Sequence, residues 1–189
     1  MAEEEKTSLA GMWEQGDVAQ LIVFHVGEEA FGIPIEEVRE IIQIGQVTPI
    51  PDSPDFVKGI INVRGDIIPT IDLGTTFYLP KKEGVLPRHI VITRKEPNIF
   101  GLMVDEVSEV LRIPKKEIKP PPKLLTTIHE EYVTGVVTNK DQLIIILDLD
   151  AVLSEEEMLR LSAATRRHLQ KPPRKPGAKI KKPPAEIPA

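Results

Sequence analysis

The sequence predicts a mostly β protein of two small five-stranded barrels or curled sheets, related by internal duplication, with short helices and one C-terminal helix. Apolar residues make up 41% of the 189-residue chain and aromatic residues only 4%, so most of the apolar content is Ile, Val and Leu. These residue types favour strands. Their runs are short and are separated by breaks that contain Gly, Pro or charged residues, which is typical of a chain of hairpins. The third observation is a repeat.

Two pairs of segments repeat along the chain. Residues 59–73 align without a gap with residues 135–149 at an offset of 76, and both segments share the first glycine, two apolar pairs and a closing Asp-Leu. Upstream, residues 31–42 align with residues 100–111 at an offset of 69. The two offsets differ by a seven-residue insertion, for which 120–128 is the natural place. Chance similarity between Val- and Ile-rich strands is the alternative, but the agreement in order, spacing and non-apolar residues favours a duplicated unit of about 65 to 70 residues.

The strands can be placed in order along each unit. In the first unit we expect strands at 18–26, 30–33, 41–44, 60–63 and 67–71. The last two flank Arg64-Gly65-Asp66, a hairpin signature in which Gly supplies a positive φ. Pro34 and the acids after it begin a short helical turn. In the second unit we expect strands at 89–93, 100–104, 107–113, 132–138 and 143–149.

The C-terminal part differs from the repeats. Ser154 and Glu157 fit a capping box, which predicts a helix over about 154–169. The expected organisation is a flexible lead (1–17), a folded domain (18–165) with subdomains at about 18–80 and 86–150, the C-terminal helix, and a disordered basic Pro-rich tail (170–189).

Charge and composition limit the function. The net charge of −5 divides into +5 in residues 170–189 and −10 in the remainder, so the acidic body argues against nucleic acid as a partner. A solvated extension is the simplest interpretation of the tail, and contact with a membrane surface or an acidic partner is the alternative. The chain has no Cys, no apolar run near the ~20 residues that cross a bilayer, and an acidic start without a signal-peptide pattern. We therefore expect a cytoplasmic protein without direct membrane insertion.

No pattern of catalytic or metal-binding residues stands out. The four histidines lack metal-ligand spacing and carboxylate partners in sequence. Asp72 and Asp148 occupy equivalent positions after strands, which indicates repeated turn chemistry rather than a catalytic pair. We expect no metal, no cofactor and no enzymatic activity.

The order of the motifs resembles the CheW family of chemotaxis coupling (adaptor) proteins over about residues 18–165. The resemblance lies in Phe-Gly-Ile-Pro-Ile-Glu-Glu-Val-Arg-Glu-Ile, in Gly-Ile-Ile-Asn-Val-Arg-Gly-Asp-Ile-Ile-Pro-Thr-Ile-Asp-Leu, and in Gly-Leu-Met-Val-Asp-Glu-Val-Ser-Glu-Val-Leu. It implies two SH3-like five-stranded β-barrels and a protein that is monomeric alone. It also implies a scaffold linking the cytoplasmic tips of chemoreceptors (methyl-accepting chemotaxis proteins) to the CheW-like domain of the histidine kinase CheA in signalling arrays.

The resemblance assigns receptor contacts to five positions of this chain: Val38, Glu40, Gly59, Asn62 and Arg64. The planar fork of Arg64 can grip a carboxylate in a bidentate manner, and Glu40 is the candidate partner. The alternative is that Arg64 is a solvated turn residue. Lys140 stands at the equivalent position of the second unit, with no Gly after it, so only the first unit has the receptor-type signature.

Kinase contacts are expected at apolar strand-edge residues of the first unit: Ile41, Ile44 and Val47. Such residues suit barrel-to-barrel pairing, and a core or covered-edge role is the alternative for each. A second class of function, a small β-barrel enzyme or ligand-binding domain, requires convergent polar groups that the sequence lacks. A closer rival is an adaptor of the same type in a non-flagellar chemosensory pathway that controls type IV pili or development.

Overall fold

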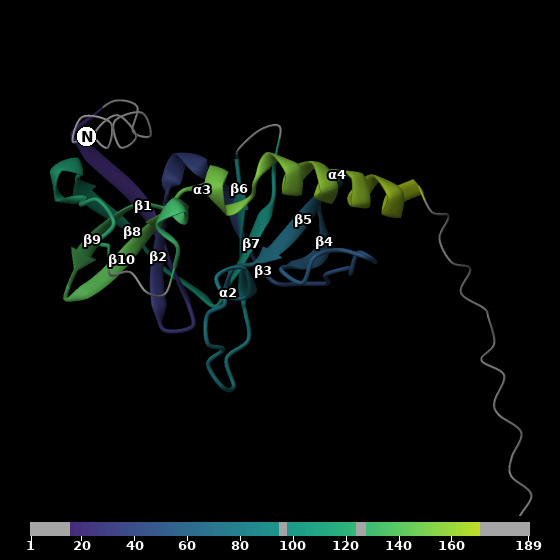
Figure 1. The fold of residues 1–189 in the computed structure, drawn as a ribbon, viewed down its shortest axis with the longest axis horizontal. Helices are drawn as coiled ribbons and strands as arrows, with labels where there is room; N and C mark the ends of the chain where they lie inside the picture. Colours follow the sequence, from purple (N-terminus) through teal and green to yellow (C-terminus); the bar gives the residue numbers. More distant parts are fainter. Residues whose placement is uncertain (1–15, 95–97, 124–127, 171–189) are drawn as a thin grey trace, which may run out of the picture.

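The computed structural model describes residues 16–94, 98–123 and 128–170, which form two five-stranded sheets side by side and a long C-terminal helix (Figure 1). The mostly β fold class predicted from the sequence is confirmed. Most of the expected lead and tail, residues 1–15 and 171–189, lies outside the described residues. No described helix is long and apolar enough to span a membrane.

The sheets are named here by their strands. Sheet A has the order β8 (Glu106–Pro114), β1 (Val18–Val26), β2 (Glu29–Pro34), β10 (Gln142–Leu147), β9 (Val133–Asn139). Sheet B has the order β3 (Val38–Gln43), β6 (His89–Thr93), β7 (Gly101–Val104), β5 (Asp66–Asp72), β4 (Val57–Val63). The helices are α2 (Leu73–Thr76), α3 (Leu149–Val152) and α4 (Glu155–Gln170), with 3₁₀ turns η1 (Ile35–Glu37), η2 (Lys115–Glu117) and η3 (Glu130–Tyr132).

Neither sheet is built from one contiguous repeat. The boundaries 18–80 and 86–150 describe the repeats of the sequence, whereas the β1–β2 hairpin completes the sheet of the second unit and β6–β7 completes that of the first. Parallel pairing of β2 with β10 and of β7 with β5 makes these joins. The two repeats thus exchange their hairpins, and these hairpins have similar strand patterns in the sequence. The sequence alone therefore could not tell exchange from contiguous folding.

Strand register supports the duplication in detail. Thr70 pairs with Gly101 in sheet B, and the equivalent residues Ile146 and Gly32 pair in sheet A. Both edge strands β3 and β8 carry a bulge one residue before the equivalent acids Glu40 and Glu109. Backbone geometry thus preserves the offsets of 69 and 76 found in the sequence.

The sheets are curled but are not closed barrels. In the described part of the chain the edge strands of each sheet do not pair with each other as a ladder. Instead, the segment after one edge strand forms a single bridge with the other: Thr48 with Ile60 of β4 in sheet B, and Lys119 with Val136 of β9 in sheet A. Prolines lie after β3 at 49, 51 and 54, and at the end of β8 and after it at 114 and 120–122. Proline has no N–H for a ladder, so closure stops at one bridge.

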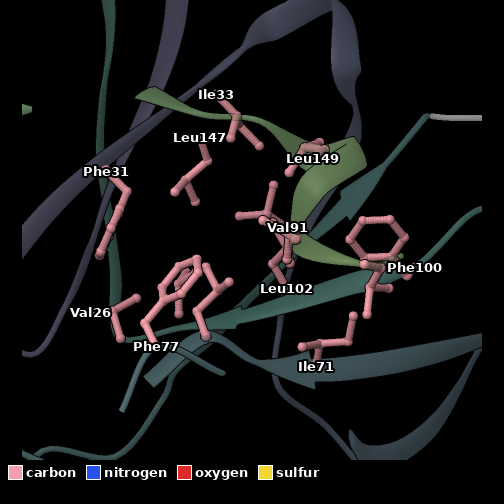
Figure 2. Close-up of a cluster of buried hydrophobic side chains, with 14 of the residues drawn as sticks. Val26, Phe31, Ile33, Ile71, Phe77, Val91, Phe100, Leu102, Leu147 and Leu149 are labelled. Carbon is pink, nitrogen blue, oxygen red and sulfur yellow. The ribbon is translucent and has the colours of Figure 1, made fainter. Parts of the chain in front are cut away.

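Three apolar clusters hold the fold together. The largest lies between the sheets and takes Phe31 and Leu147 from sheet A and Val91 and Leu102 from sheet B (Figure 2). A smaller cluster fills the concave side of each sheet. The two sheets thus share one buried interface, which each needs because a sheet of this size buries too little apolar surface to be stable alone.

Helix α4 runs along sheet B (Figure 1). Its predicted capping box is confirmed: Glu157 donates its backbone N–H to Ser154 Oγ at 3.2 Å, and Ser154 donates its backbone N–H to Glu157 Oε2 at 3.0 Å. Met158 and Leu161 are buried in the cluster between the sheets, and the helix is thereby fixed to the body of the protein.

Candidate functional site: the β4–β5 turn and the edge strand β3

The hairpin of the first unit reverses in two residues. Arg64 and Gly65 have φ values of 51° and 91°, the positive values that a tight hairpin turn with the strand twist requires. Asn62 Oδ1 accepts the backbone N–H of Gly65 at 2.9 Å, which stabilises this turn. Arg64 therefore projects from a defined backbone position, and 72% of its side chain is exposed.

Arg64 is oriented by an acid on the neighbouring edge strand. Its Nη2 donates to Glu40 Oε1, the partner expected from the sequence, and only 21% of the Glu40 side chain is exposed. Exposed ion pairs contribute only about 0 to 1 kcal/mol to stability. The pair therefore matters for the direction of the guanidinium, which has five donors and keeps some of them for a partner.

Gly59 is buried and allows a close approach of two chain segments. It has φ +145°, and a Cβ there would lie 2.1 Å from the carbonyl oxygen of Thr48. Thr48 and Ile60 exchange backbone hydrogen bonds of 2.8 and 2.9 Å beside it. Gly59 is therefore a buried residue of β4, and its lack of a side chain allows the segment after β3 to pack against this strand.

The five predicted receptor residues fall into two groups. Glu40, Asn62 and Arg64 come together at the turn and β3. Val38 is half-buried and packs against the cluster between the sheets, and Gly59 is buried. The roles of all five as receptor contacts remain predictions.

The three predicted kinase residues are not equally accessible. Ile41 is exposed, at 38%, on edge strand β3, which pairs only with β6 among the described strands. Ile44 and Val47 are partly buried against the cluster on the concave side of sheet B. Ile41 is therefore the best placed of the three for pairing with another protein.

Two charged residues at the site were missed from the sequence. Arg39 lies at the β3 bulge, where its Nη2 donates to Asp66 Oδ2 at 2.7 Å and its Nε lies 3.9 Å from Glu40 Oε1. The pattern around Arg39 suggested a helical turn, and an ion pair across a bulge has no sequence signal. No group of three or more His, Asp or Glu side chains in the described residues is arranged to hold a metal ion.

The second repeat forms the same turn without the same chemistry. Lys140 and Asp141 have φ values of 49° and 65°. Glu109, the equivalent of Glu40, accepts from Asn139 Nδ2 at 3.3 Å instead of from an arginine. The molecule thus contains its own comparison site.

Two five-stranded sheets with an arginine at the β4–β5 turn are the features that the comparison with known families has to match. A family model described as the CheW-like domain matches residues 20–157. The chain belongs to the CheW-like family.

Curated proteins and solved structures agree with this assignment. The chain is 35% identical over 149 residues to the chemotaxis protein CheW of Treponema pallidum, covering 76% of this chain and 86% of that protein. It is 33% identical over 120 residues to protein FrzA of Myxococcus xanthus, covering 62% of this chain and 73% of that protein. The crystal structure of the scaffolding protein TtCheW from Thermoanaerobacter tengcongensis superimposes with a TM-score of 0.68 at 35% identity, covering 76% of this chain and 93% of that one.

Proposed function

We propose that this chain is a non-enzymatic chemotaxis coupling protein, which links the cytoplasmic tips of chemoreceptors to the histidine kinase CheA. It would act in the cytoplasm, at membrane receptor arrays that it reaches through its partners. The observation that carries the proposal is the exposed Arg64, oriented by Glu40 on a family-matched domain. A rigid turn that presents a guanidinium suits the recognition of a carboxylate or carbonyl on a receptor helix.

Co-purification tests this function directly. The chain, a soluble cytoplasmic fragment of a chemoreceptor and CheA are mixed and separated by size. We expect one complex that contains all three, in which kinase activity responds to the receptor. If the chain retains neither the receptor fragment nor the kinase, the proposed function is wrong.

Kinase binding is expected to depend on Ile41. A charge at this exposed edge position opposes burial against an apolar partner strand, so Ile41→Asp should weaken CheA binding at least about tenfold while receptor binding stays unchanged. Val110→Asp is the matched control, since Val110 occupies the equivalent position on β8 and is 51% exposed. Isothermal titration calorimetry with the CheW-like domain of CheA measures the affinity of both variants. Equal affinities for Ile41→Asp and the unmodified chain would remove β3 as the docking edge.

A second candidate is an adaptor of the same type in a non-flagellar chemosensory pathway. The similarity to FrzA fits this alternative, while the 35% identity to the chemotaxis protein CheW of Treponema pallidum favours the first proposal. Pairing the chain with receptors from each kind of pathway separates the two, because a coupling protein of one pathway should bind its own receptors more tightly.

A further inference from the structure

A cleft of ≈ 860 Å³ lies between the β4–β5 turn and helix α4. Three arginines from three separate elements line it: Arg39 on β3, Arg94 after β6 and Arg166 on α4. The turn side contributes Asp66, and the helix side contributes Ser162 among other residues. Three segments far apart in the sequence therefore each place an arginine in the lining of this cleft. The chain as a whole is acidic, with a net charge of −5.

The backbone positions of Arg94 and Arg166 are fixed by the fold. Arg94 donates its backbone N–H to Glu37 O at 2.7 Å, which ties the end of β6 to the chain before β3. Arg166 follows Thr165, which is buried and whose Oγ1 donates to Leu161 O at 2.8 Å. Since Met158 and Leu161 fix the same helix in the core, the backbone of Arg166 is held beside the cleft that this residue lines.

Positive charge exceeds negative charge in the cleft. Asp66 is the carboxylate among the lining residues, and it already pairs with Arg39. Within the described part of the chain, Arg94 and Arg166 form no ion pair. Among the described residues, no carboxylate pairs with these two guanidinium groups.

The cleft is continuous with the β4–β5 turn. Asp66 pairs with Arg39, Arg39 lies 3.9 Å from Glu40, and Glu40 pairs with Arg64. Gly65 lines the cleft as well. One partner segment lying on the turn can therefore extend into the cleft without crossing a gap.

We propose that this cleft is a second contact for the chemoreceptor hairpin, which receives carboxylate side chains of the receptor on Arg94 and Arg166. This inference rests on the proposed function, because it extends the receptor site of the turn. Charge complementarity identifies the occupant: guanidinium forks bind carboxylates in a bidentate manner. Exposed and separated arginines suit several acids along a helical segment, and they speed association by electrostatic steering.

The test compares two double variants of the full chain with equal loss of charge. Arg94→Ala/Arg166→Ala removes the two cleft arginines that form no ion pair with a described residue. The control Arg112→Ala/Arg167→Ala removes one exposed arginine from β8 and one from the other flank of α4, where Arg167 lines a different groove. Affinity for a receptor cytoplasmic fragment is measured at low and high salt. We expect the cleft variant to bind about tenfold more weakly at low salt, with a smaller difference at high salt, and the control to change less than about twofold.

Arg64→Ala is measured alongside to separate this inference from the proposed function. If the cleft variant binds as tightly as the unmodified chain while Arg64→Ala loses affinity, the cleft proposal is overturned and the turn remains the receptor site. Equal weakening by the cleft variant and its control overturns the proposal too, because net charge alone then explains the effect. If all variants bind like the unmodified chain, both the cleft and the turn are excluded.

Discussion

Replacement of Gly59 by alanine is expected to lower the free energy of unfolding by about 3 to 5 kcal/mol. An L residue is strained at φ +145°, and its Cβ would lie 2.1 Å from the carbonyl oxygen of Thr48. Relief of this contact requires that the bridge between Thr48 and Ile60 opens. Urea unfolding followed by circular dichroism measures the loss.

Gly65 provides the matched control for this variant. It also has a positive φ, +91°, but a Cβ there would meet no atom within 4 Å. Gly65→Ala should therefore cost only the backbone strain, about 1 to 2 kcal/mol. If Gly59→Ala costs no more than Gly65→Ala, the close approach of the two segments does not limit stability as the structure indicates.

Replacement of Arg64 by alanine is expected to reduce affinity for the receptor fragment about 10- to 100-fold without unfolding the protein. Loss of a hydrogen bond to a charged group costs about 1.5 to 3 kcal/mol, and each 1.4 kcal/mol is about tenfold in affinity. Stability should change by less than about 1 kcal/mol, because 72% of the Arg64 side chain is exposed. Titration with the fragment and a urea unfolding curve provide both numbers.

The second repeat again supplies the control. Lys140 has the same backbone conformation as Arg64, with φ 49°, and the same place in its hairpin. Lys140→Ala should therefore leave receptor binding unchanged. Comparable losses for the two variants would mean that the receptor does not distinguish the two turns.

The β4–β5 hairpin shows that individual strands and turns are determined by local sequence. Ile, Val and a Gly-containing break were enough to predict β4 and β5, because strand propensity and turn chemistry act over a few residues. The same holds for α4, whose N-terminus was predicted from the capping box formed by Ser154 and Glu157. The repeat offsets also predicted which strands are equivalent, and the register of Thr70 with Gly101 follows them.

Which distant strands pair with each other could not be predicted from the sequence. The exchange of the β1–β2 and β6–β7 hairpins depends on which of two similar partners each hairpin meets, and the repeats make those partners alike. The barrels expected from strand count stay open because prolines follow β3 and β8. Both outcomes are decided by long-range geometry.

The candidate site was predicted in part. Arg64 and its partner Glu40 were identified, and the structure confirms the ion pair. Arg39 and Asp66 were missed because a β-bulge turns Arg39 toward the turn. Ile44 and Val47 carry the same apolar signal as Ile41, but they pack against the protein itself. Strand alternation alone did not separate a docking residue from a covered one.

The central claim is that the receptor binds at the turn of sheet B and not at its copy in sheet A. The chain contains no cysteine, so Asp66→Cys and Gln142→Cys each introduce one thiol, at equivalent exposed positions beside the two turns. A thiol-linked photo-crosslinker is attached to each variant, and the assembled complex with receptor fragment and CheA is irradiated. We predict crosslinks to the receptor from position 66 and none from position 142; equal crosslinking from both positions, or crosslinking from position 142 alone, would contradict the account.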